Sequence, residues 1–205
     1  MFTGIIQAVG EIDAITKDGE DLTLSIQARS LGLDDVQIGD SIAVNGICLT
    51  ATHLNNTHFE VHVSKETLNV TTGLNNKQTV NLEKALRLQD RLGGHLVSGH
   101  IDGIGQVMRF ERLSSQNIGD CWLLEILAPH AISKYIAKKG SICVNGVSLT
   151  VNSIEKDTFS MNIIPHTLEN TTFKQLKINS QVNLEIDQIA RYIERISEWN
   201  NSNAA

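Results

Sequence analysis

Two side chains that could act as nucleophiles stand at matching places in this chain. Cys48 lies in SIAVNGICLT (41–50) and Ser148 lies in SICVNGVSLT (141–150), and each precedes a Leu-Thr pair. A thiol or a hydroxyl in such a place can attack an electrophile or donate a hydrogen bond. Neither segment contains an adjacent base, and free cysteines are usually small buried hydrophobes, so both roles stay open for Cys48.

Serine, asparagine and threonine recur around these two positions. Such side chains can recognise the donors and acceptors of a polar heterocycle or a polyol, but they also serve in turns. The turn role is the stronger interpretation for the asparagines and the weaker one for threonines in strand-like runs. The set comprises Ser41, Asn45, Thr50 and Thr67, with Ser141, Asn145, Thr150 and Thr167 at the matching positions.

The segment GGHLVSGHIDG (93–103) is rich in glycine and histidine. His95 and His100 are five residues apart, so on a strand they would point to opposite faces and would not share a metal ion. The chain contains neither GxGxxG nor GxxxxGK[ST]. No pattern therefore predicts a metal centre or a nucleotide phosphate site.

The candidate residues recur because the whole chain repeats. Seven of the ten positions in 41–50 are identical in 141–150. A period this long exceeds that of solenoid repeats and predicts a duplicated domain. One ligand pocket in each copy is a natural hypothesis for such a chain. Further matches join KETLNVTT (65–72) to PHTLENTT (165–172), VNLE (80–83) to VNLE (182–185), and TGIIQAVGEI (3–12) to SGHIDGIGQV (98–107).

The elements that must position these residues are mostly strands. Asn-Gly at 45–46 and at 145–146 predicts β-hairpins, because both residue types accept positive φ. FEVHVS (59–64) and FSMNII (159–164) alternate as half-buried strands do. Several such strands at regular spacing indicate a small barrel or sandwich in each copy. The segments 65–72 and 165–172 then form a short helical turn or loop.

The C-terminal segment differs from the repeat. Ile186, Ile189, Ile193 and Ile196 recur at helical spacing within 186–201, and Tyr192 and Trp199 extend the apolar stripe. This pattern predicts an amphipathic helix. The helix would either pack on its own barrel or mediate oligomerisation, and the tail 200–205 is expected to lack structure.

The repeat and this helix divide the chain into three parts. We expect a first barrel at 1–92, a second barrel at 93–187, and a helix with its tail at 188–205. The polar segment 88–95, with its paired glycines, is the natural linker between the barrels.

Composition excludes several classes of function. Hydrophobic residues make up 41% and charged residues 20% of the 205 positions, which is a globular and not a disordered balance. A net charge of −6 without a basic run argues against nucleic acid and anionic membranes as partners. Three cysteines without a CxxC pair indicate free thiols in a reducing compartment. With no signal-peptide pattern and no apolar run near the ~18 residues of a membrane span, a cytoplasmic, soluble protein is expected.

Six motifs in register resemble the α-type riboflavin synthase family. They are MFTGI, NGICLT, KETL, GGHLVSGHIDG, NGVSLTV and IPHTLENTT, and together they span nearly the whole chain. The resemblance implies a mostly β fold of two tandem homologous six-stranded Greek-key β-barrels plus a C-terminal α-helix. It also implies a homotrimer that uses this helix, and no cofactor or metal.

The resemblance further implies a transferase that dismutates two molecules of 6,7-dimethyl-8-ribityllumazine. One molecule would donate four carbons to the other, giving riboflavin and 5-amino-6-ribitylaminouracil. Each barrel would bind one lumazine, with the active site between the first barrel of one subunit and the second barrel of its neighbour. Association with lumazine synthase fits the same chemistry. The alternative is a non-catalytic lumazine- or flavin-binding antenna protein, but such proteins tend to lack the Cys-Leu-Thr and Gly-His signatures present here.

Site residues follow from the resemblance position by position. Cys48, His100 and Ser148 are expected near the chemistry, and Phe2 is expected to shape the mouth of the first pocket. The first pocket would comprise Gly4, Ile5, Ile6, Ser41, Cys48, Leu49, Thr50, His62, Val63, Ser64, Lys65, Glu66 and Thr67. The second would comprise Gly99, His100, Ile101, Lys139, Ser148, Leu149, Thr150, Asn162, Ile163, Ile164, Pro165, His166 and Thr167.

The chain departs from the family pattern at one position. Asn145 stands where some members carry an aspartate, and an amide cannot act as a base. The two copies also differ from each other, because His166 replaces the acidic Glu66. The two pockets are therefore expected to be unequal, as a donor site and an acceptor site should be.

Overall fold

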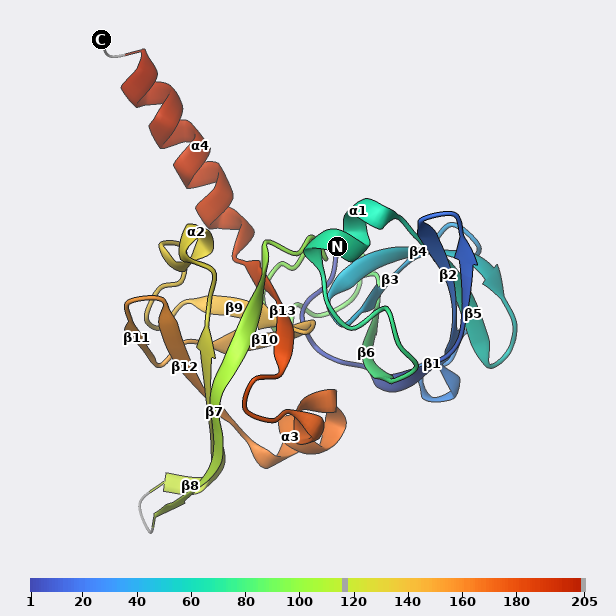
Figure 1. The fold of residues 1–205 in the computed structure, drawn as a ribbon, viewed down its shortest axis with the longest axis horizontal. Coiled ribbons are helices and arrows are strands. Elements are labelled where there is room, and N and C mark those ends of the chain that lie inside the picture. The colour runs from blue at the N-terminus through green and yellow to red at the C-terminus, as the bar shows by residue number, and fades with distance from the viewer. Residues whose placement is uncertain (116–117, 204–205) are drawn as a thin grey trace.

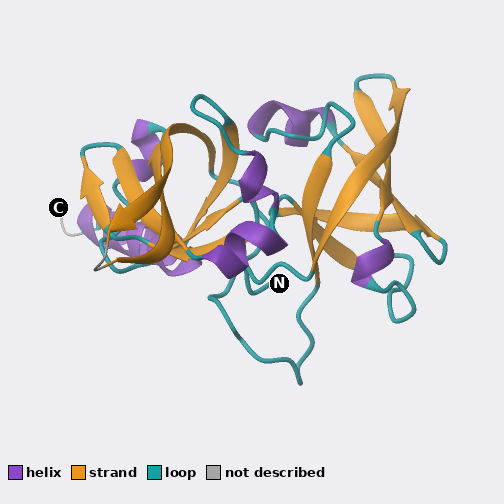
Figure 2. Cartoon of the chain, turned by 90° about the horizontal axis from the view of Figure 1, so that it is seen from below, coloured by secondary structure: helices purple, strands orange, loops and turns teal. Residues whose placement is uncertain are grey.

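A computed structural model describes residues 1–115 and 118–203 of the chain. Two β-structures lie side by side, and a C-terminal helix projects away from them (Figure 1). Figure 2 shows that loop segments join the two bodies. The mostly β fold predicted from the sequence, with tandem domains and a C-terminal helix, is confirmed.

The first copy is a closed antiparallel barrel of six strands in the order β1-β2-β5-β4-β3-β6. Its core is built from alternate strand residues such as Leu24, Ile26, Phe59 and Val61, none of which is exposed. Closure leaves no free strand edge. The strands are β1 (Ala8–Asp18), β2 (Asp21–Gln27), β3 (Ser41–Val44), β4 (Ile47–Leu54), β5 (His58–Val63) and β6 (Thr79–Lys84).

The second copy is a curled sheet of seven strands in the order β10-β9-β13-β7-β8-β12-β11. The expected six strands become seven because the equivalent of β4 is broken after Thr150. At the break the Asn152 amide donates to the Ser160 carbonyl over 2.8 Å, so the chain still follows β12. The strands are β7 (Gly103–Ser115), β8 (Ile118–Leu127), β9 (Ser141–Val144), β10 (Val147–Thr150), β11 (Ser153–Glu155), β12 (Thr158–Ile163) and β13 (Gln181–Ile186).

Short helices follow equivalent strands of the two copies, as predicted from the KETL and PHTL motifs. In α1 (Lys65–Val70) the Ser64 hydroxyl caps the helix by accepting the Thr67 amide. In α3 (Pro165–Asn170) Ile164 provides no cap, and Pro165 instead presets the first turn. The remaining short helices are α2 (His130–Ser133) and the 3₁₀ turns Arg29–Leu31 and Thr172–Gln175.

A seam of buried asparagines relates the two copies by a pseudo-twofold axis. The Asn81 side-chain amide donates to the Asn145 carbonyl over 2.9 Å, and the Asn183 side-chain amide donates to the Asn45 carbonyl over 3.1 Å. Each Asn-Gly hairpin has positive φ at both residues, as predicted. The two hairpins meet at Gly46, where a Cβ would lie 2.6 Å from the Gly146 nitrogen. The copies therefore touch through backbone that tolerates no side chain.

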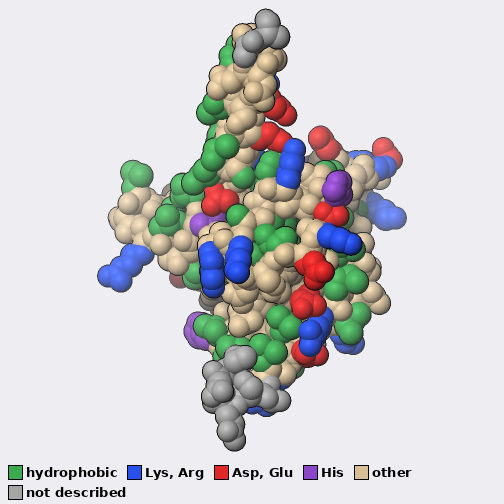
Figure 3. All heavy atoms as spheres, turned by 90° about the vertical axis from the view of Figure 1, so that its left-hand side faces the viewer, with side chains coloured by type: hydrophobic (Ala, Val, Ile, Leu, Met, Phe, Trp, Pro, Cys, Tyr) green, Lys and Arg blue, Asp and Glu red, His purple; other side chains and the backbone are tan. Residues whose placement is uncertain are grey.

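The C-terminal helix α4 (Gln188–Ser202) leaves its apolar stripe uncovered. Ile186 does not belong to it: this residue ends β13 and is 3% exposed. Asp187 caps the helix by accepting the Ile189 amide over 3.0 Å, and the helix continues through residues 200–202, which were expected to lack structure. Ile189, Tyr192, Ile193, Ile196 and Trp199 are each 59–68% exposed. Apolar side chains line one edge of the projecting helix in Figure 3, so the stripe does not pack on its own barrel.

Candidate functional site

The outer face of β3, β4 and β5 gathers the polar residues singled out in the first copy. The register pairs Ser41 with Thr50 and places Cys48 opposite Ala43, so these side chains share one face of the hairpin. Ala51 pairs with Val61, and His62 follows on the outward side of β5. We call Ser41, Cys48, Thr50 and His62 the first surface.

The second copy presents an equivalent face. Ser141 pairs with Thr150 and Cys143 with Ser148, and Asn162 lies outward on β12. We call Ser141, Ser148, Thr150 and Asn162 the second surface. Lys139 adjoins it with φ of 66° where the first copy has Gly39. A lysine held in the left-handed region costs about 1 kcal/mol, and such strain tends to persist at functional sites.

A segment that contains a glycine lies over each surface: the segment around Gly99 covers the first surface, and the segment around Gly4 covers the second. We call these two the cover segments. The Cys48 amide donates to the Gly99 carbonyl over 2.9 Å, and the Ser148 amide donates to the Gly4 carbonyl over 2.8 Å. A Cβ on either glycine would lie 2.6 Å from the Cβ of the residue beneath it. Both glycines also have positive φ, so only glycine fits these two positions.

The cover segments are exchanged relative to the pockets expected from the sequence. Gly4, Ile5 and Ile6 were assigned to the first pocket, but Gly4 lies on Ser148 and Ile6 packs against the core of the second copy. Gly99 lies on Cys48, and Ile101 packs against the core of the first copy. The pseudo-twofold axis causes this exchange, because each copy sends its glycine segment across the seam. The segment with His100 thus adjoins Cys48, so two of the three residues expected near the chemistry belong to the first surface, while Ser148 belongs to the second.

Two buried carboxylates anchor the cover segments. Glu83 accepts the amides of Thr3 and Gly4 over 2.7 and 3.0 Å, and Glu185 accepts those of Ser98 and Gly99 over 2.7 and 2.8 Å. Burial raises the pKa of Glu83, while the hydrogen bonds from Thr3 and Gly4 oppose that shift. Each segment is therefore anchored to its own copy and lies on the other.

A histidine that the sequence analysis assigned to the linker contacts Ser148. The His95 Nδ1 lies 2.7 Å from the Ser148 Oγ, while its Nε2 is enclosed without a partner among the described residues. Burial lowers the pKa of His95, and the nearby carboxylates of Asp187 and Glu185 only partly offset this. A neutral imidazole at this distance can accept the serine proton, which is the geometry of a nucleophile with its base. The Gly-Gly-His run was the only sequence signal for this contact.

The two surfaces differ in the residues next to the first turns of α1 and α3. Asp21 accepts the Lys65 amide over 2.8 Å and contacts the His62 Nε2 at 3.0 Å. The Lys65 amide contributes most to lowering the pKa of Asp21, and His62 adds to the effect. The strand register places Cys121 where the first copy has Asp21. The first surface is thus bordered by Asp21 and Lys65, where the second surface has Cys121 and Pro165.

The remaining expected site residues divide into exposed and interior positions. Ser64, Glu66 and Ile164, Pro165, His166 are exposed at the two helix starts, and Thr67 and Thr167 are half-buried there. Leu49, Val63, Leu149 and Ile163 point into the barrel cores, so they shape the surfaces through their backbone. Phe2 is fully buried between the copies beside Val97 and does not lie at an open mouth.

Two further positions lie in the seam between the copies. The Asn145 side chain accepts the Asn183 amide over 2.8 Å, so it braces the seam and faces neither surface. Cys143 is buried there, and burial raises the pKa of its thiol well above the usual range. Cys143 is therefore an inert thiol.

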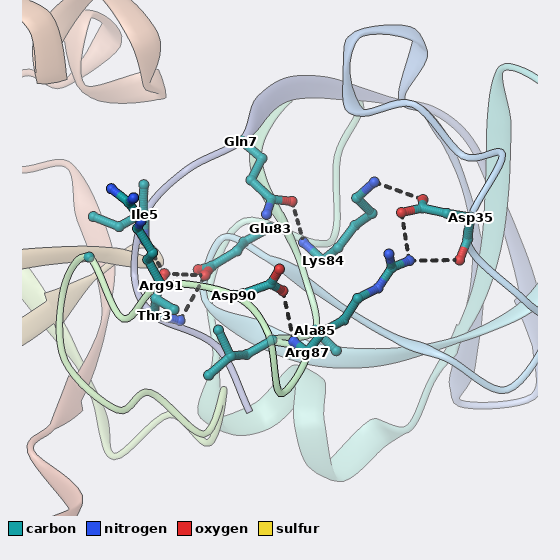
Figure 4. A pocket seen from close by; sticks show the side chains of 12 residues that line it. Thr3, Ile5, Gln7, Asp35, Glu83, Lys84, Ala85, Arg87, Asp90 and Arg91 are labelled. Atoms are coloured by element: carbon teal, nitrogen blue, oxygen red, sulfur yellow. Dashed lines mark hydrogen bonds and ion pairs between the residues drawn. The ribbon is translucent and has the colours of Figure 1, made fainter.

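A cleft of about 450 Å³ opens beside Ile5, between the end of β6 and the loop at 90–93 (Figure 4). Its cations are largely neutralised, because Asp35 contacts the Lys84 Nζ at 2.8 Å and an Arg87 nitrogen at 2.6 Å. The hydrogen bond from Lys84 is the main cause of the lowered pKa of Asp35. Among the described residues no group of three or more His, Cys, Asp or Glu side chains could hold a metal ion.

Comparison with known proteins relates this architecture to a family. The model of the lumazine binding domain matches residues 3–85 and again 98–187. A riboflavin synthase from Photobacterium phosphoreum is 48% identical over 198 residues, covering 96% of this chain and 88% of the relative. The chain belongs to the riboflavin synthase family. It is therefore an enzyme of the transferase class.

Other members of the family and their structural neighbours agree with this assignment. A riboflavin synthase from Bacillus subtilis (strain 168) is 41% identical over 205 residues, covering 99% of this chain and 93% of the relative. The crystal structure of LumP complexed with riboflavin aligns with a TM-score of 0.79 and 28% identity, over 91% of this chain and 99% of that one. LumP complexed with 6,7-dimethyl-8-(1'-D-ribityl) lumazine aligns with a TM-score of 0.78 and 26% identity over the same shares. In the part of the chain that the structure describes, no helix is both long and apolar enough to span a membrane.

Proposed function

We propose that the chain dismutates two molecules of 6,7-dimethyl-8-ribityllumazine. Four carbons pass from one molecule to the other, giving one riboflavin and one 5-amino-6-ribitylaminouracil. The observation that carries the proposal is the pair of equivalent surfaces, each with a nucleophile-type side chain beneath a glycine cover. Relatives named riboflavin synthase support it, as does LumP, whose structures contain riboflavin and this lumazine.

Two equivalent surfaces suit a reaction between two like molecules. Holding both in a fixed orientation makes the encounter effectively intramolecular, which is worth up to ~7–11 kcal/mol in favourable cases. The proposal assigns one lumazine to the part at 1–92 and one to the part at 93–187. The serine and threonine hydroxyls of each surface would bind the ring and the ribityl chain.

The remaining task for the protein is proton transfer. The C7 methyl of the lumazine is acidic because its carbanion delocalises into the ring, so a positioned base can remove a proton. Ser148 with His95 supplies such a pair on the second surface, while on the first surface Cys48 lies beneath the segment that carries His100. The unequal borders of the surfaces, with Asp21 on one and Cys121 on the other, suit a donor site and an acceptor site.

The proposal also includes a homotrimer assembled through α4. A stripe of five apolar side chains, each 59–68% exposed, fits contact with further copies of the chain. The first surface of one subunit would then face the second surface of its neighbour. This trimer would work in the cytoplasm, where lumazine synthase would supply the substrate.

Light scattering should show a smaller particle for Ile193→Glu, whereas Glu198→Ala on the opposite helix face should leave the mass unchanged. A trimeric Ile193→Glu variant would refute this assembly.

The deciding experiment is incubation of the purified chain with 6,7-dimethyl-8-ribityllumazine alone. One riboflavin formed for two lumazines consumed, without added cofactor, would support the dismutation. Tight binding without turnover would instead favour a non-catalytic lumazine- or flavin-binding protein, an alternative that fits the likeness to LumP complexed with riboflavin and with the lumazine.

Variants of the two surfaces test the roles of the named residues. Cys48→Ser, His100→Gln and Ser148→Ala should each lower turnover by at least about tenfold, which is at the low end for a lost proton-transfer group. Ser30→Ala, on an exposed 3₁₀ turn, is the matched control and should have no effect. A Ser148→Ala variant with full activity would remove Ser148 and His95 from the mechanism.

A further inference from the structure

Arg191 connects the C-terminal helix to the segment that covers the first surface. Its Nη2 donates to the His100 carbonyl over 2.9 Å and to the Asp102 Oδ2 over 2.7 Å. The same Asp102 oxygen accepts the Ile186 amide over 2.9 Å. The Arg191 side chain is 32% exposed and that of Asp102 is 19% exposed, so this charged contact is partly shielded from water. A residue of α4 thus holds the backbone of His100.

The first copy contains a hydrogen bond equivalent to the one between the Ile186 amide and Asp102, but its acceptor is a neutral side chain. Gln7 stands where the second copy has Asp102, and its Oε1 accepts the Lys84 amide over 2.9 Å. Both residues therefore accept the amide at the end of the last strand of their copy. A neutral glutamine satisfies that amide, so the carboxylate of Asp102 is not needed for the strand. Its additional partner is Arg191.

The two cover segments differ in the same way. Ile5 stands where the second copy has His100, and among the described residues no arginine donates to the Ile5 carbonyl. Among the described residues, the Asp102–Arg191 pair thus occurs at the cover segment that carries His100 and not at the one that carries Ile5. The described part of the first copy has no helix equivalent to α4 after its last strand, so this contact is specific to the cover segment that carries His100.

We propose that Arg191 is a positioning residue that fixes His100 over the first surface from the C-terminal helix. The inference rests on the proposed function for the role of His100, while the fixing of the segment stands on the contacts alone. Since the same helix carries the uncovered apolar stripe, assembly through α4 would also set the position of His100.

Amide hydrogen exchange of the full chain without ligand tests the positioning directly. Arg191→Ala should speed exchange in the segment 97–102 by about tenfold, the effect of losing one or two charge-assisted hydrogen bonds. Arg191→Lys, which keeps the charge, should restore part of the protection. The matched control is Arg195→Ala, one turn later on the same helix, where the arginine side chain is 68% exposed. Equal exchange in Arg191→Ala and Arg195→Ala would overturn the proposal.

Turnover of 6,7-dimethyl-8-ribityllumazine supplies the second readout. Arg191→Ala should lower kcat by about tenfold with little change in KM, because the lost geometry concerns the reacting groups. The loss should nearly vanish in a His100→Ala background, since Arg191 acts through His100. Additive losses would overturn the proposal. A wild-type chain that binds lumazine without turning it over would refute only the proposed dismutation, and the exchange result would still decide the positioning.

Discussion

Replacing Glu185 by glutamine tests the anchor of the Gly99 cover. The carboxylate accepts three hydrogen bonds, from the Ser98 amide at 2.7 Å, the Ser98 hydroxyl at 2.6 Å and the Gly99 amide at 2.8 Å. Glutamine keeps one oxygen for Ser98 but turns its NH₂ group toward the Gly99 amide. Gly99 is buried, so its N–H loses its acceptor without gaining water.

The expected loss in the free energy of unfolding follows from these three hydrogen bonds. A buried unsatisfied donor costs about 1–3 kcal/mol, and loss of the charge weakens the two remaining bonds by about 1 kcal/mol in total. Relief of the desolvated charge offsets part of this. We expect Glu185→Gln to lower the free energy of unfolding by about 1–3 kcal/mol.

Urea unfolding at fixed protein concentration measures the change. The midpoint should fall by roughly 1 M for a typical dependence on denaturant, and Glu155→Gln, an exposed strand position, should leave it unchanged. If Glu185→Gln unfolds at the same urea concentration as the control, the carboxylate does not hold the cover segment and the reasoning fails.

Three further predictions concern the seam and the second surface. Gly46→Ala should destabilise the chain by more than Gly19→Ala, because both have positive φ but only the Cβ at Gly46 would meet backbone of the other copy; equal unfolding midpoints would contradict a close seam. Lys139→Gly should raise stability by up to about 1 kcal/mol through relief of the left-handed backbone, while raising KM for lumazine; an unchanged KM would exclude Lys139 from binding. The pKa of His95 is lowered from 6.5 by burial, so below pH 6.5 the unfolded chain binds more protons than the folded one, and stability falls as the pH drops. His95→Asn should flatten that slope in urea titrations at pH 5 and 7, and an unaltered slope would mean that His95 titrates normally.

Local features of the fold could be predicted from the sequence. The Asn-Gly hairpins, the alternating strands at 59–64 and 159–164, and the short helices after them all depend on neighbouring residues. The break after Thr150 could not be predicted, because residues 147–150 match 47–50 closely while the strand partners differ. The apolar stripe of α4 gave the helix but not its exposure, which depends on where the preceding strand ends.

The candidate site was only partly predictable for a geometric reason. Spacing along the chain placed Gly4 near the first copy and Gly99 near the second, since each begins its own repeat. The pseudo-twofold axis reverses both placements, and no pattern in one sequence reveals an axis. The contact of His95 with Ser148 could not be predicted either, because it joins residues 53 positions apart within the second part of the chain.

The reciprocal bonds of the seam have an evolutionary consequence. Asn81 with Asn145 and Asn183 with Asn45 repeat one contact in both directions, which is the pattern of an isologous interface between identical subunits. A single-copy ancestor could have formed these bonds with its own twin, each lending its glycine segment to the other. Fusion of two such copies would allow the halves to differ: here one carries Gln7 and Ser64, and the other carries Asp102 and Ile164 at the matching positions. Two halves that are no longer identical can bind two molecules of the same compound in different ways.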